Sequence, residues 1–530
     1  MAVKPLGAQL SHMLKSRGVE VIFGIPGVHN QEMYRGIEEA GLTHVLARNE
    51  QGAGFMADGY ARATGKPGVA YVITGPGLCN IMTPMGQAYS DSVSMLVLSS
   101  CLNRADLGMG RGRLHEMKDQ RGAAETVCEW SKTAMDADSA YQLVDRAFFG
   151  FKSHRPRPKH IQIPIEVLES PAEPAPQAEA SVLRSQVHAD ALATCRQALA
   201  EAQKPLFVFG GGAVGGAKIW SQIATRCGAA SFCTYAARGI ADADPLCFGA
   251  NLARPDSVEI IVQADLVMVV GSELSECDLW RDQLGHTGKL IRIDLDPAEL
   301  TDNTAGTVSI CADAVSLGRA LLAAMRPEAS APCWSRDEVD AAKSRWRAQG
   351  DAERPGILPL IDALHETLPR ETMIYSDMTQ FAYLAKEVYP MDRPGHWHHP
   401  YGFGTLGFAL PAAIGGKVGL GRAPVISING DSGFQYNIQE LATAVELKLC
   451  LPIIVWDNGK LKEIEDSMVG AQIAPNAVIA GNPDFCKLAE AYGARAVAPR
   501  SISTFKAALV EALAADGPTL IHITPETAQA

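Results

Sequence analysis

Two side chains that could bind a divalent cation follow neighbouring apolar runs of the chain. Asp431 comes after the run at residues 425–429, and Asn458 comes 27 positions later, after the run at residues 453–456. Because the carboxyl ends of parallel strands meet at one edge of a sheet, both side chains can reach one point there. Their oxygen atoms suit Mg²⁺ holding a phosphate group, and a helix that starts near Gly433 would add backbone N–H groups facing the anion. Either turn alone would be an ordinary loop, but the pair at this spacing favours a cofactor site.

Two further motifs carry less information on their own. Glu50 lies at a predicted strand-to-helix junction, where a carboxylate is usually a charge in the first helical turn. Gly210, Gly212 and Gly215 satisfy the Gly-x-Gly-x-x-Gly pattern of dinucleotide-binding turns, but no acidic residue follows about 20 positions later. A tight structural turn is the favoured interpretation, and a nicotinamide-dependent dehydrogenase is the weaker alternative.

The elements that must position these residues alternate between short apolar runs and helical patterns. This alternation predicts an α/β fold with three doubly wound parallel-sheet domains, at residues 1–170, 183–330 and 350–530. The predicted strands are residues 19–24, 69–74, 95–99, 206–209, 266–270, 290–294, 373–376, 425–429, 453–456 and 519–523. The predicted helices are residues 9–17, 31–40, 53–64 and 438–447. Residues 170–176 and 326–332 have the composition of linkers.

The composition argues against several classes of protein. Of the 530 residues, 47% are hydrophobic and 20% are charged, as in a soluble globular protein. The net charge is −12 and no block of Lys and Arg stands out, so we expect no nucleic-acid surface. Twelve cysteines without a Cys-x-x-Cys pair indicate reduced packing cysteines and a cytoplasmic location. The first residues lack the apolar core of a signal peptide, and no apolar run reaches the length of about 18 residues that a membrane span needs.

Taken together, the motifs resemble those of thiamine diphosphate-dependent enzymes of the acetolactate synthase and 2-oxo acid decarboxylase superfamily. The resemblance covers nearly the whole chain and implies a pyrimidine-binding, a central and a diphosphate-binding domain. The matching segments are residues 23–27, 50–53, 57–62, 74–77, 402–413 and 430–458. Ser432 stands where the family usually has glycine and Asp457 where it has asparagine, and neither departure removes a metal ligand.

The resemblance also implies roles for individual residues. Glu50 would hydrogen-bond the aminopyrimidine ring of the cofactor and favour the tautomer that takes the thiazolium C2 proton, while Leu406 would hold the two rings in a bent arrangement. Asp431, Asn458 and the carbonyl of Lys460 would bind Mg²⁺. The other implied cofactor contacts are Pro26, Thr379, Gln380, Gly404, Gly430, Ser432 and Gly433. Since the family builds each site from Glu50 of one subunit and Asp431 of another, a homodimer or homotetramer is implied.

Segments that would border the substrate resemble the 5-guanidino-2-oxopentanoate (2-ketoarginine) decarboxylases. The segment after Asn458 carries Glu463, Glu465 and Asp466, whereas this segment is mostly apolar in acetolactate synthases. On a helix Glu463 and Asp466 share a face, and carboxylates there would suit a guanidinium tail. A charged run is more often a solvated helix face, and Lys462 could neutralise the same carboxylates.

Loops at residues 24–30 and 110–121 resemble the same subfamily. They contribute Val28 as a substrate contact and His29, His115 and Gln120 as catalytic candidates. His399 is a further candidate for proton transfer, because histidine titrates near neutrality. Glu273 and Glu276 put negative charge where acetolactate synthases bind FAD, so FAD is not expected.

We therefore expect a thiamine diphosphate- and Mg²⁺-dependent decarboxylase of a 2-oxo acid. The favoured substrate is 5-guanidino-2-oxopentanoate, which would place the enzyme in arginine catabolism. The first alternative is an acetolactate synthase, which joins the product of pyruvate decarboxylation to a second oxo acid. The second is an inactive cofactor-binding homologue, against which the presence of Glu50 argues.

Overall fold

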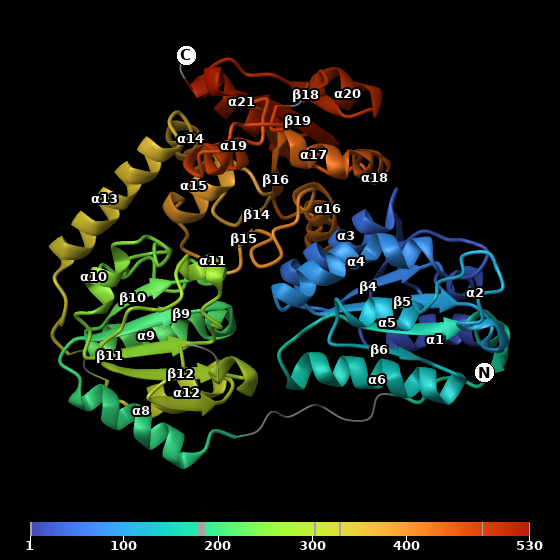
Figure 1. Ribbon diagram of the computed structural model, residues 1–530, viewed down its shortest axis with the longest axis horizontal. Coiled ribbons are helices and arrows are strands. Elements are labelled where there is room, and N and C mark those ends of the chain that lie inside the picture. The colour runs from blue at the N-terminus through green and yellow to red at the C-terminus, as the bar shows by residue number, and fades with distance from the viewer. Residues whose placement is uncertain (1–2, 178–185, 302–303, 328–329, 480, 529–530) are drawn as a thin grey trace. The chain divides into compact units, whose positions relative to one another are not determined.

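The computed structural model describes residues 3–177, 186–301, 304–327, 330–479 and 481–528 (Figure 1). The chain forms two compact units. The first contains residues 1–182, 371–379 and 398–530, and the second contains residues 183–370 and 380–397. Parallel sheets of six, five and six strands with helices around them confirm the predicted α/β class. Residues 328 and 329 of the second predicted linker lie outside the described residues.

The N-terminal half of the first unit is built on a six-stranded sheet of order β3-β2-β4-β5-β7-β6, with parallel pairing throughout. Its strands are β2 (Val21–Gly24), β3 (Thr43–Leu46), β4 (Gly68–Val72), β5 (Met95–Cys101), β6 (Trp130–Thr133) and β7 (Lys159–Pro164). Strand β5 is buried along its whole length, as expected of a strand covered on both faces. The helices are α1 (Leu6–Ser16), α2 (Gln31–Arg35), α3 (Glu50–Thr64), α4 (Pro76–Ser90), α5 (Gln120–Glu125), α6 (Ala137–Ser153) and α7 (Ile165–Glu169).

The C-terminal half of the first unit contains the second six-stranded sheet, of order β15-β14-β16-β17-β19-β18. Its strands are β14 (Met373–Ser376), β15 (Trp397–His398), β16 (Val425–Gly430), β17 (Leu451–Trp456), β18 (Arg495–Val497) and β19 (Pro518–Ile523). The helices are α16 (Ala409–Leu420), α17 (Asp431–Tyr436), α18 (Leu441–Glu446), α19 (Lys462–Gly470), α20 (Phe485–Ala491) and α21 (Ile502–Leu513). A 3₁₀ turn, η5 (Ile438–Glu440), joins the region of α17 to α18.

Helices α3 and α16 join these two halves by packing backbone against backbone (Figure 1). A Cβ atom on Gly59 of α3 would lie 2.0 Å from the carbonyl oxygen of Ala412, and one on Gly415 of α16 would lie 1.9 Å from that of Met56. Only glycine leaves room for such an approach. Helix α3 is thereby held by the C-terminal half, and Glu50 is its first residue.

The second unit contains a five-stranded parallel sheet of order β10-β9-β11-β12-β13. The strands are β9 (Pro205–Phe209), β10 (Ala230–Cys233), β11 (Leu266–Val270), β12 (Lys289–Asp294) and β13 (Val308–Cys311). The principal helices are α8 (Ala189–Glu201), α9 (Ala217–Cys227), α10 (Ser257–Ile261), α11 (Glu276–Leu279), α12 (Ala314–Ala324), α13 (Arg336–Glu353), α14 (Leu358–Thr367) and α15 (Gln380–Val388). Close packing accounts for two of its motif glycines, since a Cβ on Gly210 would lie 2.2 Å from Gly271 O and one on Gly212 would lie 3.0 Å from Gly271 Cα.

The observed elements correct several of the sequence-based boundaries. The helix predicted at residues 9–17 spans Leu6–Ser16, and the one predicted at residues 438–447 is divided into η5 and α18. The helix predicted at residues 31–40 ends at Arg35, because Gly36 packs against the backbone of Ala8. The helix predicted at residues 53–64 begins at Glu50, where the Asn49 side chain accepts a hydrogen bond from Gln51 N. The first predicted linker is partly regular, since β8 (Pro171–Ala172) pairs antiparallel with β1 (Lys4–Pro5).

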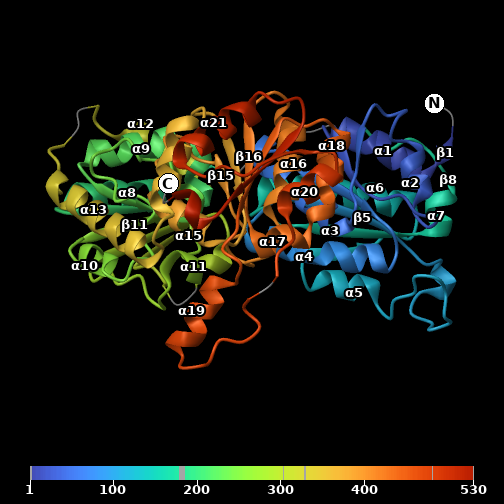
Figure 2. The same ribbon diagram turned by 90° about the horizontal axis from the view of Figure 1, so that it is seen from above.

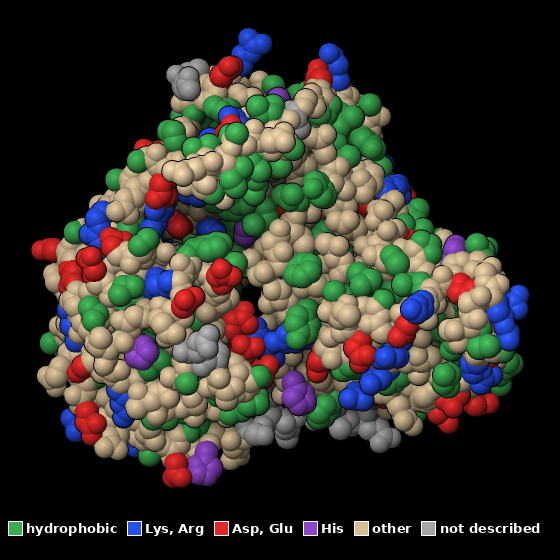
Figure 3. All heavy atoms as spheres, viewed as in Figure 1, with side chains coloured by type: hydrophobic (Ala, Val, Ile, Leu, Met, Phe, Trp, Pro, Cys, Tyr) green, Lys and Arg blue, Asp and Glu red, His purple; other side chains and the backbone are tan. Residues whose placement is uncertain are grey.

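Two further features are the distribution of charge on one face and the lengths of the helices. On the face seen in Figure 3, Lys and Arg side chains are scattered among Asp and Glu side chains. None of the described helices combines the length and the apolar composition that crossing a membrane requires.

Candidate functional site

Strands β16 and β17 bring the candidate metal ligands to one edge of their sheet. The strands pair in parallel with Gly430 opposite Trp456, so Asp431 and the turn at residues 457–459 leave the sheet side by side. The backbone N–H of Gly459 donates to Asp431 Oδ2 and to Asp457 Oδ1, at 3.0 Å in each case. Asn458 lies within this turn, and its Oδ1 accepts a hydrogen bond from Lys460 N at 3.3 Å.

Asn482 joins the two carboxylates, although no sequence motif indicated it. Its Nδ2 donates to Asp431 Oδ2 at 2.7 Å and to Asp457 Oδ1 at 2.8 Å. Burial raises the pKa of Asp431, and the hydrogen bond from Asn482 partly opposes this shift. Burial also disfavours the charge of Asp457, but hydrogen bonds from His522, at 2.9 Å, and Asn482 leave its pKa below the usual value. A carboxylate, a carboxamide oxygen and a backbone carbonyl of Lys460 are the hard oxygen donors that suit Mg²⁺.

Asp377 organises the loop that contains Gly404 and Leu406. It follows β14, is fully buried, and its Oδ2 accepts a hydrogen bond from Gly407 N at 2.9 Å. Burial raises its pKa to about 6. A Cβ atom on Gly433 would lie 2.7 Å from Asp377 Oδ2, so the α17 turn also packs directly on this carboxylate. Asp377 therefore fixes the loop against the start of α17, which the sequence alone did not reveal.

The other predicted cofactor contacts lie at strand ends and turns. Thr379 is buried and belongs to the first unit. A Cβ atom on Gly430 would lie 3.1 Å from the Cβ of Thr379. Gln380 is the first residue of α15 and belongs to the second unit. Pro26 lies in the segment after β2, and Ser432 N donates to Asp431 Oδ1 at 2.9 Å.

Glu50 is buried at the first position of α3, close to the start of α4. Asn80 of α4 donates from Nδ2 to Glu50 Oε2 at 2.9 Å. A Cβ atom on Gly77 would lie 3.3 Å from Glu50 Oε1, so glycine leaves space beside this oxygen. The structure thus holds one carboxylate oxygen by a side-chain amide, a contact that the sequence analysis missed because Asn80 belongs to no recognised motif.

Two of the predicted catalytic histidines lie together. The ring centroids of His29 and His115 are 5.0 Å apart, with an edge-to-face angle of 68°. Within the described part of the chain, the Nδ1 atoms of both rings are buried and make no hydrogen bond. Burial, followed by the neighbouring His115, lowers the pKa of His29. His399 lies elsewhere, with its Nδ1 3.0 Å from Ser376 Oγ and its ring against Tyr401.

Gln120 is buried in a hydrogen-bonded network at the ends of the N-terminal strands. Its Oε1 accepts from Gly75 N at 2.9 Å, and its Nε2 donates to Ser100 O at 2.9 Å and to Gln162 Oε1 at 3.1 Å. These contacts fix the turn before α4, whereas the catalytic role predicted for Gln120 stays a prediction.

The predicted substrate segment forms helix α19, which stands out from the sheet to which it is attached (Figure 2). Glu463 and Asp466 therefore do lie three residues apart on one helix. Lys462 pairs with Asp466, and it also lies 3.5 Å from Glu465, so the expected neutralisation is partly realised. Val28 is 63% exposed, in the segment before α2.

Comparison with known proteins gives matches along most of the chain. Residues 5–123 match the N-terminal TPP binding domain of thiamine pyrophosphate enzymes, residues 192–321 their central domain, and residues 377–523 their C-terminal TPP binding domain. The chain is 40% identical to the probable 2-ketoarginine decarboxylase AruI of Pseudomonas aeruginosa, over 98% of this chain and 93% of that protein. It is 29% identical to the large subunit of acetolactate synthase isozyme 2 of Escherichia coli, over 98% and 95% of the two chains. With the acetolactate synthase of Arthrospira platensis the identity is 30%, over 96% and 92%.

Proposed function

The chain belongs to the thiamine pyrophosphate enzyme family, and we propose that it decarboxylates 5-guanidino-2-oxopentanoate to 4-guanidinobutanal and CO₂. The observation that carries this proposal is its higher full-length identity to a probable 2-ketoarginine decarboxylase than to acetolactate synthases. The reaction is non-oxidative, since the carboxylate leaves as CO₂ and a proton takes its place.

The residues at the strand ends fit the cofactor and its metal. Asp431, Asn458 and the Lys460 carbonyl would bind Mg²⁺, and the backbone at the start of α17 would face the diphosphate. Thiamine diphosphate, when bound, supplies the electron sink for loss of CO₂. Glu50 would hold a proton at the aminopyrimidine ring, and its hydrogen bond from Asn80 orients the carboxylate for that contact.

A decarboxylase must also deliver a proton to the carbon that lost CO₂. His29 and His115 are suited to this role, because they are adjacent imidazoles whose Nδ1 atoms have no hydrogen-bond partner among the described residues. Their pairing supports decarboxylation over joining to a second oxo acid, since a nearby proton donor would compete with the second substrate.

We propose that Glu463 binds the guanidinium group of the substrate. Asp466 is exposed and forms an ion pair with Lys462. Glu463 lies one turn earlier on the same helix and is half-buried. A carboxylate binds a guanidinium in a two-pronged, charge-assisted arrangement that an uncharged substrate cannot make.

A panel of 2-oxo acids tests the proposed function. Purified protein with thiamine diphosphate and Mg²⁺ should release CO₂ and aldehyde fastest from 5-guanidino-2-oxopentanoate. Acetolactate from pyruvate as the best product would instead establish the acetolactate synthase alternative. Glu50→Gln should bind the cofactor but lose decarboxylation by about 10²–10⁴-fold, because it removes an acid–base group. A wild-type protein that binds the cofactor and transforms no 2-oxo acid would favour an inactive homologue.

We also propose that each site is shared between two copies of the chain. Glu50 of one copy and Asp431 of the other would face the same cofactor, in a homodimer or homotetramer. Mixing two differently inactivated variants tests this arrangement, as described below.

A further inference from the structure

Glu440, the last residue of η5, binds the segment that leads into Glu50. Its side chain is fully buried. The backbone N–H of Arg48 donates to both carboxylate oxygens, at 3.0 and 3.1 Å, and that of Asn49 donates to Oε1 at 3.0 Å. The hydroxyl of Thr443 donates to Oε2 at 2.9 Å. The carboxylate therefore satisfies two consecutive backbone N–H groups immediately before α3.

The first turn of α3 is shaped to accept this carboxylate. A Cβ atom on Gly52 would lie 2.2 Å from Glu440 Oε1 and 2.5 Å from its carboxyl carbon. Every larger residue at position 52 would push the carboxylate away from the Arg48 and Asn49 N–H groups. Contacts from two directions thus fix the carboxylate against the start of the helix.

We propose that Glu440 is a positioning residue for catalysis, which sets the location of the Glu50 backbone. This inference rests on the role of Glu50 in the proposed function. Asn80 orients the Glu50 carboxylate, but an orienting contact places the oxygens correctly only if the backbone of residue 50 is fixed. Glu440 supplies that fixed point from the C-terminal half of the unit.

The turn that contains Glu440 also holds the loop of the implied cofactor contacts. Asn437 lies three residues before Glu440, and its Nδ2 donates to Gly407 O at 2.8 Å. Gly407 directly follows Leu406. One short turn therefore fixes both the loop at residues 404–407 and the segment that begins α3. A buried carboxylate with only a stabilising role would not need to contact the residues next to the catalytic glutamate.

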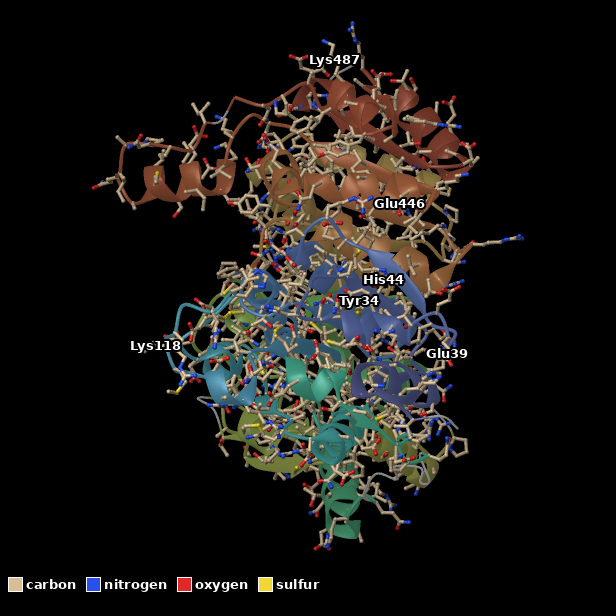
Figure 4. The ribbon with its side chains drawn as sticks, turned by 90° about the vertical axis from the view of Figure 1, so that its right-hand side faces the viewer. Tyr34, Glu39, His44, Lys118, Glu446 and Lys487 are labelled. Carbon is tan, nitrogen blue, oxygen red and sulfur yellow. The ribbon has the colours of Figure 1, made fainter. Side chains whose placement is uncertain are left out.

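Glu440→Gln is the direct test, because the amide is isosteric but keeps only one acceptor. Its NH₂ group would face a backbone N–H, so amides of residues 46–52 should exchange with deuterium about tenfold faster in the cofactor-free protein. Exchange of the thiamine diphosphate C2 proton in the holoprotein should slow about tenfold or more, with cofactor affinity nearly unchanged. Glu446→Gln is the matched control, since Glu446 is exposed (Figure 4) and forms an ion pair with the side chain of Arg48 rather than with its backbone, and it should leave both exchange rates at the wild-type values.

Unchanged deuterium uptake and C2 exchange in folded Glu440→Gln would overturn the proposal. So would an equal loss of cofactor affinity and C2 exchange together with increased uptake throughout the molecule, because that result indicates general destabilisation. If Glu440→Gln does not fold, Thr443→Val should show the same local changes to a smaller extent, and their absence would overturn the proposal. The failure of the proposed function can be told apart from the failure of this inference. Unchanged C2 exchange in Glu50→Gln would contradict the proposed role of Glu50. Deuterium uptake at residues 46–52 measures the Glu440 contact independently of that role.

Discussion

Replacing Gly59 by alanine would separate the two helices that join the halves of the first unit. The Cβ atom would lie 2.0 Å from Ala412 O, whereas ordinary van der Waals contact begins at 3.4 Å, so the backbones must part by the difference of 1.4 Å. The obstructing atoms belong to the backbone of α16 and cannot move aside as a side chain can. Such overpacking costs about 1–3 kcal/mol, partly offset by about 1 kcal/mol from the better helix propensity of alanine.

The displacement should reach Glu50, which lies nine residues earlier on α3. At a rise of 1.5 Å per residue the separation is about 13 Å, and a helix transmits a shift over this distance as a rigid rod. A misplacement of about 1 Å can cost about 10²-fold in rate. We therefore expect Gly59→Ala to lower kcat/KM about 10²-fold, with a smaller effect on cofactor affinity, because Asp431 and Asn458 do not lie on α3.

The assay combines the melting temperature, cofactor affinity and decarboxylation of the best substrate. Gly517→Ala is the control, because none of the described residues lies within 4 Å of a Cβ there and the Gly517 backbone is not left-handed. Wild-type melting temperature and kcat/KM in Gly59→Ala would refute the close helix contact and the transmission argued from it.

Three further predictions concern pH, specificity and assembly. Burial raises the pKa of Glu440 from 4.5 to about 7, so the fold favours the protonated form, and the stabilisation present below pH 4.5 is lost as pH rises through 7. Relative to Glu440→Gln, the wild type should lose about 3 kcal/mol of unfolding free energy between pH 4.5 and 8. A difference in melting temperature between the two proteins that does not vary with pH would contradict this. Glu463→Gln should lower kcat/KM for the guanidino substrate by roughly 10–100-fold more than for an uncharged 2-oxo acid, whereas equal losses would exclude Glu463 from reading the tail. Mixed Glu50→Gln and Asp431→Ala subunits should regain about a quarter of wild-type activity, since half of the dimers would each contain one intact site; no recovery after proven subunit exchange would contradict shared sites.

The strands could be predicted because a strand that is buried on both faces needs a continuous apolar sequence. Continuous apolar runs such as residues 266–270 and 373–376 coincide with β11 and β14, both buried throughout. The alignment of Asp431 with the turn at residues 457–459 also followed from strand ends alone. The predicted end of the helix at residues 31–40 was wrong, because the observed end depends on the packing of Gly36 against Ala8, which is distant in the sequence.

The residues that support the site could not be predicted either, because they too act through contacts with segments that are distant in the sequence. Glu440 contacts Arg48 and Asn49, almost 400 positions earlier, and nothing in its local sequence distinguishes it from a surface glutamate. Asp377 and Asn482 likewise act through contacts that only the folded sheets create. Spacing along the chain identifies residues that meet at a strand end, but it gives no information on which distant side chain completes the hydrogen bonds.

The Asn482 carboxamide would make ion binding at the proposed Mg²⁺ site an exchange of ligands. Its two N–H bonds stabilise two neighbouring carboxylates, Asp431 and Asp457, without adding positive charge. A cation that bound Asp431 Oδ2 would compete with the Asn482 N–H for the lone pairs of that oxygen. The affinity for Mg²⁺ at the proposed site would then be a difference between two sets of bonds. Asn482 would thus act as an internal competitor and disfavour ions that bind too weakly to displace an amide.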